Sequence, residues 1–169
     1  MDVAGLGAEF ARRDVAGQGI GALSPRDSTS ARIGAANVSV AYGRPARRGR
    51  QVLGLLVPYG REWRAGANLI TRLTTDRELR VGDRWLPAGS YGLFTLATPQ
   101  GWTLVVNRRT GVSGTQYDPA LDLARIPMTF AAGRPETERF TISLEPAGEG
   151  GRLRLAWDTW DVSVPLLAR

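Results

Sequence analysis

The chain has 169 residues, of which 43% are hydrophobic and 22% charged, as is ordinary for one globular domain. It contains no His, Cys or Lys, which excludes metal sites built on imidazole or thiolate, Ser-His-Asp and Cys-His catalysis and lysine Schiff bases, so no metal or cofactor is expected. The net charge of +6 comes from scattered arginines without a basic run or a nucleic-acid motif, and no apolar run approaches the roughly 18 residues of a membrane span, so neither a nucleic-acid partner nor a transmembrane segment is predicted.

Residues 1–23 are predicted to form a flexible tail, because glycine recurs through them and no apolar periodicity is sustained. They lack the apolar central segment of a secretory signal. The polar stretch SPRDSTS, residues 24–30, leads into the ordered part. A single domain is therefore predicted over residues 24–169.

From about residue 33 the apolar residues recur with a period of two, which is typical of strands that bury one face. Two further stretches, residues 90–97 and 102–107, are apolar on both faces and are predicted to be central strands. Turn signals rich in Gly and Pro separate the segments. The strands with one apolar face are NVSVAY (37–42), ERFTISLE (138–145), RLRLAW (152–157) and VSVPL (162–166).

One helical turn is predicted in YDPALDLAR, residues 117–125, with Asp118 as the N-cap and Pro119 at the first helical position. Regularly spaced short strands joined by Gly and Pro turns indicate an antiparallel sandwich or barrel. The predicted fold class is all-β: a single antiparallel β-sandwich, jelly-roll-like, with about eight or nine short strands and this one helical turn.

Two connections rich in Gly and Pro, residues 42–50 and 57–68, carry many Arg, aromatic and amide side chains. Guanidinium groups on rigid turns suit bidentate binding of a carboxylate or phosphate, and aromatic and amide groups beside them suit a sugar. Alternatively, the arginines pair with Glu62, Asp118, Asp122 or backbone carbonyls and hold the loops. The candidate ligand-binding residues in these connections are Tyr42, Arg44, Arg50, Tyr59, Arg64 and Asn68.

The five tryptophans are predicted to serve packing. Trp63 lies in the second connection and is expected to fill the core with its indole N–H on a carbonyl. The other four lie in or beside predicted strands: Trp85, Trp102, Trp157 and Trp160.

The later segment adds Tyr117, Asp118, Asp122 and Arg125 as candidate ligand-binding residues. A pair of carboxylates can act as acid and base in glycoside cleavage. Asp118 and Asp122 are only four residues apart, which is too local to straddle a substrate, and Asp118 already has a capping role. No catalytic residue is assigned from the sequence.

Seven motifs in a fixed order resemble one uncharacterised bacterial family, the domain of unknown function 2911. They are SPRDS, VAYGRPARRGR, LVPYGREWRAGAN, PAGSYGLFTL, GWTLVVNRRTG, GTQYD and WDTWDVSVP. The resemblance covers about residues 24–166. It implies a single β-rich domain, commonly behind a signal peptide or lipoprotein signal and hence exported, and it implies no established activity. The matching positions are Tyr42, Gly43, Arg44, Pro45, Gly49, Arg50, Pro58, Tyr59, Gly60, Trp63, Arg64, Gly66, Ala67, Asn68, Thr71, Asn107, Tyr117, Asp118, Asp122 and Arg125.

The sequence departs from the family pattern at two places. Leu69 and Ile70 stand where members often have a small or acidic residue followed by Ala. Val112 and Ser113 stand where many members carry Gln-Trp. If that Trp contributes to a family ligand site, the site of this protein is altered or lost.

Three functional hypotheses follow. The first is a non-catalytic domain that binds a small anion or a carbohydrate through the Arg, Tyr and Asn residues, and it requires these residues to converge on one surface. The second is an enzyme that uses a carboxylate or Tyr with electrostatic stabilisation by Arg. The third is a structural or interaction module whose loops close the sandwich. The sequence favours binding over catalysis.

Overall fold

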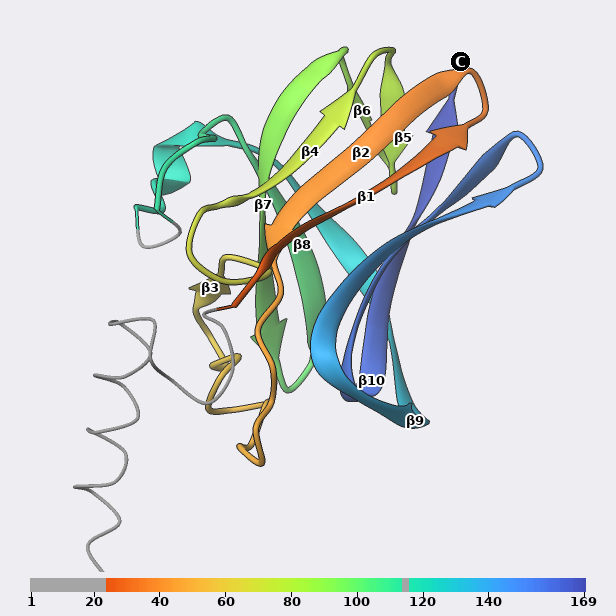
Figure 1. Cartoon of the computed structure of the whole chain (residues 1–169). Helices are drawn as coiled ribbons and strands as arrows, with labels where there is room; N and C mark the ends of the chain where they lie inside the picture. Colours follow the sequence, from red (N-terminus) through yellow and green to blue (C-terminus); the bar gives the residue numbers. More distant parts are fainter. Residues whose placement is uncertain (1–23, 114–115) are drawn as a thin grey trace, which may run out of the picture.

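The computed structural model describes residues 24–113 and 116–169, and these residues form one antiparallel β-sheet with a single 3₁₀ turn (Figure 1). The predicted all-β sandwich with one helical turn is confirmed, and the predicted tail lies outside the described residues. The strands are β1 (Arg26–Ile33), β2 (Ala36–Gly43), β3 (Glu62–Trp63), β4 (Thr71–Thr75), β5 (Leu79–Val81), β6 (Arg84–Leu86), β7 (Gly89–Thr98), β8 (Gly101–Asn107), β9 (Asp122–Ala147) and β10 (Gly150–Ala168), and the 3₁₀ helix is Pro119–Leu121.

The order of strands across the sheet is β1-β2-β4-β7-β8-β9-β10-β5-β6, with the short β3 paired to β7. Most neighbours in the sheet are therefore neighbours in the chain. The exception is the β5–β6 hairpin, which leaves the path between β4 and β7 and pairs with the far end of β10. No helix of the described residues is long and apolar enough to cross a membrane.

Two long strands turn this one sheet into two layers. β9 pairs with β8 only over its first residues and then with β10 over the rest of its length. Register shifts on either side of Asp158 bend the β9–β10 pair, and Asp158 itself has a left-handed φ of 52°. The bent pair lies over the layer formed by β1, β2, β4, β7 and β8 (Figure 1). The end of β2 then joins the second layer, because Phe140 N donates to the Pro45 carbonyl at 2.9 Å.

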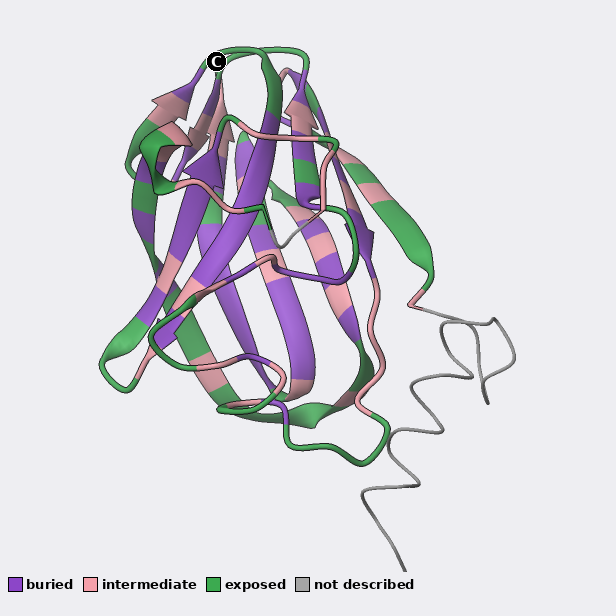
Figure 2. Cartoon of the chain, turned by 90° about the vertical axis from the view of Figure 1, so that its left-hand side faces the viewer, coloured by how far each residue is buried: buried purple, intermediate pink, exposed green. Residues whose placement is uncertain are grey.

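The core fills the space between the layers with the residues that the alternating pattern assigns to buried faces. Val38 and Val40 of β2 lie there, opposite Ile142 of β9 and Leu155 of β10. Buried and exposed residues alternate along these strands, and the loops and hairpin ends are largely exposed (Figure 2). Residues 91–95 of β7 are buried without alternation, as predicted for a central strand.

Aromatic rings form the centre of this core. Trp63 is 9% exposed and lies 4.9 Å from the Phe140 ring and 5.9 Å from the Trp157 ring, measured between centroids. The prediction that Trp63 is a core residue is confirmed. Trp85 differs from the prediction, because it is only partly buried and carries the Arg169 guanidinium 4.0 Å from its ring centre.

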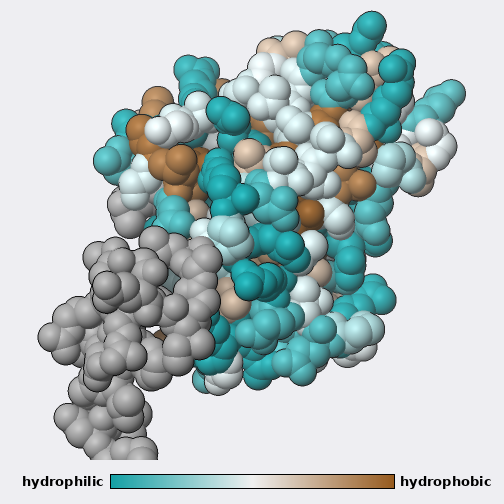
Figure 3. Space-filling view, in the orientation of Figure 1, coloured by the Kyte–Doolittle hydropathy of each residue, from teal (hydrophilic) through white to brown (hydrophobic). Residues whose placement is uncertain are grey.

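Two strands are much longer than the short strands predicted. The structure has ten strands, and β9 and β10 are 26 and 19 residues long. Gly133 and Pro135 lie in a bulge of β9: the pairing with β10 passes from Thr137 opposite Asp158 to Ala132 opposite Trp160, and residues 133–136 between them have no partner on β10. In the space-filling view the face toward the viewer is mostly hydrophilic, with apolar side chains showing only in places (Figure 3).

Replacing Trp157 by Ala should cost about 3–5 kcal/mol of unfolding free energy, the usual range for a large aromatic residue removed from a core. Trp157 is 1% exposed, and its indole N–H donates to the Glu138 carbonyl at 2.9 Å. Urea denaturation measures the change. Leu55→Ala is the control, because Leu55 is 62% exposed and its loss should cost less than about 0.5 kcal/mol. Equal effects of the two variants would contradict this assignment of the core.

Candidate functional site

Several candidate residues gather on the outer face of the first layer, which points away from the main core. Across this face Phe94 of β7 pairs with Val105 of β8, which pairs with Arg125 of β9. Phe94 and Val105 are buried together with Ile70, separately from the main core. Tyr117 packs its ring on Phe94 with 4.8 Å between centroids. The connection between β8 and β9 therefore covers this face and brings Tyr117 to it.

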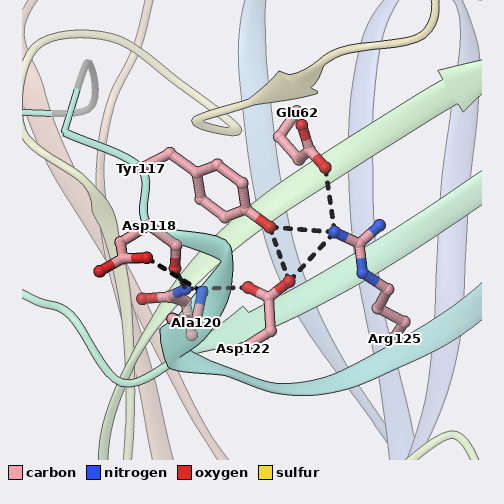
Figure 4. Close-up of polar contacts among 7 residues, drawn as sticks. Glu62, Tyr117, Asp118, Ala120, Asp122 and Arg125 are labelled. Carbon is pink, nitrogen blue, oxygen red and sulfur yellow. Dashed lines mark hydrogen bonds and ion pairs between the residues drawn. The ribbon is translucent and has the colours of Figure 1, made fainter.

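Tyr117, Asp122 and Arg125 form a hydrogen-bonded network with Glu62 and Asn107, which we call the Asp122 network (Figure 4). The Tyr117 hydroxyl donates to Asp122 Oδ2 at 2.6 Å, and Asn107 Nδ2 donates to Asp122 Oδ1 at 2.9 Å. Arg125 Nη2 donates to Asp122 Oδ2 and to the Tyr117 hydroxyl, both at 3.0 Å. It also reaches across two strands to Glu62 Oε1 at 2.9 Å.

The two carboxylates of this segment have separate structural roles. Asp118 is the N-cap of the 3₁₀ turn, as predicted, and its Oδ1 accepts from Ala120 N at 3.0 Å. Asp122 is the first residue of β9, and its side chain is 14% exposed. Both oxygens of Asp122 accept hydrogen bonds, Oδ2 from Tyr117 and Arg125 and Oδ1 from Asn107, so these contacts fix the position of the carboxylate.

The Asp122 network also keeps Tyr117 and Arg125 protonated. Burial, and then the hydrogen bond to Asp122, raise the pKa of Tyr117 well above its ordinary value. The hydrogen bond to Glu62 is the largest cause that raises the pKa of Arg125. A neutral Tyr117 and a charged Arg125 therefore persist across the physiological pH range. The arrangement fastens the β8–β9 connection to the sheet.

A second feature is the segment of residues 64–70, which we call the Arg64 loop. It crosses β2 at Gly43, where a Cβ atom would collide with the Ala67 carbonyl. Ala65 and Asn68 adopt left-handed φ values of 47° and 65°. The buried hydroxyl of Thr71 donates to the Ala65 carbonyl at 2.7 Å and holds this conformation. Strained backbone of this kind persists only where surrounding contacts determine it, and it concentrates at functional sites.

Arg64 is the half-buried cation of this loop. It follows Glu62 by two residues, so strand alternation places it on the same face, about 6.6 Å away along the chain. Within residues 24–113 and 116–169 its side chain makes one long hydrogen bond, from Nε to the Gly66 carbonyl at 3.4 Å, and no ion pair. Burial lowers its pKa. Glu62, the nearest carboxylate along the chain, is engaged by Arg125 instead.

Two of the predicted arginines follow the alternative in which they hold loops. Arg44 donates from Nε to the Phe140 carbonyl at 3.1 Å and pairs with Asp27 at 3.2 Å. Arg50 donates to the carbonyls of Arg47 and Ala46 at 2.9 and 2.8 Å. Neither guanidinium contacts the Arg64 loop.

The remaining predicted residues lie in three different surroundings. Tyr42 is 2% exposed, and its hydroxyl accepts from Ile142 N at 3.1 Å within the core. Tyr59 is 47% exposed, and the chain at this point is tied to β7 by Gly60 N donating to the Ala97 carbonyl at 2.8 Å. Asn68 is exposed in the Arg64 loop. The structure thus brings Arg64, Asn68, Tyr117, Asp122 and Arg125 to one face and places Tyr42, Arg44 and Arg50 elsewhere. The full set does not converge on one surface as the first hypothesis required, so a binding role can rest only on the residues of this face.

Arg26 and Arg72 belong to this face but were not among the predicted site residues. Arg26 Nη2 lies 3.5 Å from the Ile70 carbonyl at the end of the Arg64 loop. Burial, followed by repulsion from Arg72, lowers the pKa of Arg26. The alternation in TRLTT, residues 71–75, would have placed Arg72 on the outer face, but nothing in the sequence indicates that Arg26 approaches it.

The two places where the sequence departs from the family pattern lie against each other. Ile70 N donates to the Val112 carbonyl at 2.9 Å, and Leu69 forms an antiparallel bridge with Ser113. Val112 also packs on the small cluster that contains Ile70. The paired changes therefore concern one contact, between the Arg64 loop and the β8–β9 connection. In the described part of the chain, no three Asp or Glu residues come together as metal ligands.

Tyr117→Phe should lower the unfolding free energy by about 1–2 kcal/mol, because the variant leaves Asp122 Oδ2 with one donor fewer. Chemical denaturation near pH 7 measures the loss. Tyr59→Phe is the matched control, since the Tyr59 hydroxyl is bound to no group among the described residues, and it should change stability by less than about 0.5 kcal/mol. Similar values for the two variants would show that the network adds nothing.

The stabilisation supplied by Tyr117 should disappear at alkaline pH. The unfolded chain loses the Tyr117 proton near pH 10, whereas the folded protein keeps it because its pKa is raised. The native state then binds more protons than the unfolded state, so stability falls as pH rises above about 10. We expect the stability difference between the wild type and Tyr117→Phe to shrink from about pH 9 to 11. A difference that stays constant or grows over this range would contradict the raised pKa.

Comparison with known proteins now gives the family. No curated protein and no solved structure matches the chain. One family model does, and its match spans residues 24–166, from the first described residue to a point two residues before the end of β10. The match contains both the Asp122 network and the Arg64 loop. The chain belongs to the family described as Protein of unknown function (DUF2911).

Proposed function

We propose that this protein binds a small organic anion, such as a dicarboxylate, a phosphate ester or an acidic sugar, at Arg64 and does not transform it. One observation carries the proposal: Arg64 is half-buried without a carboxylate partner among the described residues. A guanidinium removed from water costs free energy unless a charge or several acceptors compensate it. A bound carboxylate or phosphate would supply both.

Among the described residues some arginines pair with a carboxylate, whereas Arg64, like the partly buried Arg80 and Arg109, forms no ion pair. Arg44, Arg125 and Arg154 each pair with a carboxylate, at 3.2, 2.9 and 3.0 Å. Arg64 does not, although Glu62 precedes it by only two residues. The network commits Glu62 to Arg125, which leaves the positive charge of Arg64 uncompensated. An unpaired guanidinium offers the planar pair of donors that suits a carboxylate or phosphate.

The loop that carries Arg64 is fixed before any ligand arrives. The Thr71 hydroxyl holds the Ala65 carbonyl, and Gly43 allows the loop to lie directly on β2. A preformed site loses less conformational freedom on binding, which favours affinity. Asn68 adds an exposed amide to the same loop, and Arg26 and Arg72 add positive charge at its edge.

The surrounding groups favour binding over catalysis. The Asp122 carboxylate has donors on both oxygens, and Tyr117 keeps its proton. Both groups are therefore engaged in holding the β8–β9 connection, which supports a binding role over a catalytic one. A neutral carbohydrate would not compensate the positive charge of Arg64. An acidic sugar therefore fits the site better than a neutral one.

The test is thermal unfolding of the full chain with inorganic phosphate, succinate, citrate, glucuronate and neutral glucose. A ligand at 100 times its dissociation constant stabilises by about 2.7 kcal/mol, which is several degrees for a domain of this size. We expect at least one of the anions, and not glucose, to raise the unfolding temperature. Arg64→Met should abolish the rise, because it keeps the apolar stem and removes the guanidinium.

Controls separate binding from a role in the scaffold. Arg61→Met removes a neighbouring, exposed arginine and should leave the ligand effect intact. Without ligand, Arg64→Met should be as stable as the wild type or more stable, since it removes an uncompensated half-buried charge. The proposal fails if no anion stabilises the wild type while Arg64→Met unfolds several degrees lower, because Arg64 would then belong to the scaffold.

A further inference from the structure

A hollow of about 350 Å³ at the β5–β6 end of the molecule has a different composition from the Arg64 loop. Its walls come from β6, the start of β7 and the residues that flank the β8–β9 connection. They include Arg84, Trp85, Pro87, Tyr91, Arg108 and Leu123. None of them belongs to the Arg64 loop or the Asp122 network. The volume is at the lower end of the range for small-molecule sites, about 300–1,000 Å³, and therefore suits one small ring compound.

Contacts between strands fix the walls of this hollow. Arg84 Nη2 donates to the Leu123 carbonyl at 3.2 Å and joins β6 to β9. The Tyr91 hydroxyl donates to the Pro87 carbonyl at 2.5 Å and is thereby satisfied. Arg108 N donates to the Leu121 carbonyl at 2.9 Å, which fixes the backbone on the opposite side. The hollow is thus formed without a ligand.

The charge around the hollow is positive. Its lining contains two arginines and no acidic residue. Two further guanidinium groups, those of Arg169 and Arg80, lie 4.0 and 5.8 Å from the centre of the Trp85 ring. Two acidic residues outside the lining are Glu78, whose carboxylate lies 3.8 Å from Arg169, and the exposed Asp83. A hollow with cations on its walls and carboxylates only outside attracts an anion.

Two hydrogen-bond donors remain without acceptors among the described residues. The Arg108 side chain is exposed and makes no hydrogen bond there, and the Trp85 indole N–H makes none either. Beside them, Pro87, Tyr91 and Leu123 supply apolar wall. A partly exposed Trp beside an Arg suits a ligand that has both a ring and a negative charge. The ring of the ligand packs on the apolar surface, and its anionic group accepts hydrogen bonds from the guanidinium.

We infer that this hollow is a second binding site, for a small ring compound that carries a carboxylate. Its ring packs against Trp85, Pro87 and Leu123, and its carboxylate accepts from Arg108 and from the free N–H groups of Arg84. Both an aromatic acid and a sugar acid have this chemistry. The inference is independent of the proposed function, since the two sites share no residue.

The experiment follows the indole N–H signals of the ¹⁵N-labelled full chain. The five tryptophans give five such signals, and Trp85→Phe identifies the one that belongs to Trp85. Benzoate and glucuronate are titrated at millimolar concentrations, with benzyl alcohol and glucose as neutral counterparts. We expect the Trp85 signal to shift to saturation with at least one acid and not with the neutral compounds. Saturation with benzoate alone identifies an aromatic-acid site, and saturation with glucuronate alone a sugar-acid site.

Arg108→Met should weaken the binding at least about tenfold, as expected for the loss of a charge-assisted hydrogen bond. Arg108 is exposed, so unchanged signals of the four other tryptophans will show that the variant is folded. Arg64→Met should bind as the wild type does, which separates this site from the Arg64 loop. The inference is overturned if neither acid saturates the Trp85 signal, if the neutral compounds shift it equally, or if Arg108→Met binds with unchanged affinity.

Discussion

The pairing of β9 with β10 is the constraint on which the rest of the structure depends. β9 is hydrogen-bonded to β8 at its beginning and to β10 beyond, and β10 ends on β5, so one continuous sheet supplies both layers of the sandwich. The bend at Asp158 lets the two strands close over the core without breaking their pairing. Because β9 begins at Asp122, the strand that closes the fold also positions the Asp122 network on its outer face.

The outer face shows how two long-range contacts produce an unpaired cation. Gly43 leaves room for the Arg64 loop to lie on β2, and the loop buries half of Arg64. Arg125 reaches across the sheet and forms an ion pair with Glu62, the carboxylate closest to Arg64 in the chain. A scaffold that served stability alone would pair or expose Arg64, because a half-buried charge without compensation is unfavourable. This is the physical reason for proposing a binding site there.

Part of the acid–base chemistry that the composition leaves to this protein holds the fold together. With no His, Cys or Lys, acid–base work could come only from carboxylates, Tyr and hydroxyls. The Asp122 network commits a Tyr and two of these carboxylates to holding a connection. The two sites proposed above carry positive charge, at Arg64 and in the hollow beside Arg108. Both places favour recognition of an anion over its transformation.

By itself the sequence determined the all-β class, the buried faces of the strands, the capped turn at Asp118 and the core position of Trp63, because alternation, N-capping and aromatic burial are local properties. It also identified Arg64, Tyr117, Asp122 and Arg125 as candidates. Only the tertiary structure decided that Arg44 and Arg50 are bound to loop partners, that Arg125 pairs with Glu62 and that Arg64 has no carboxylate partner among the described residues. Each of these outcomes depends on which residues distant in the chain meet across the sheet. Glu62 and Arg125 are 63 positions apart, and no periodic pattern in either segment specifies their contact.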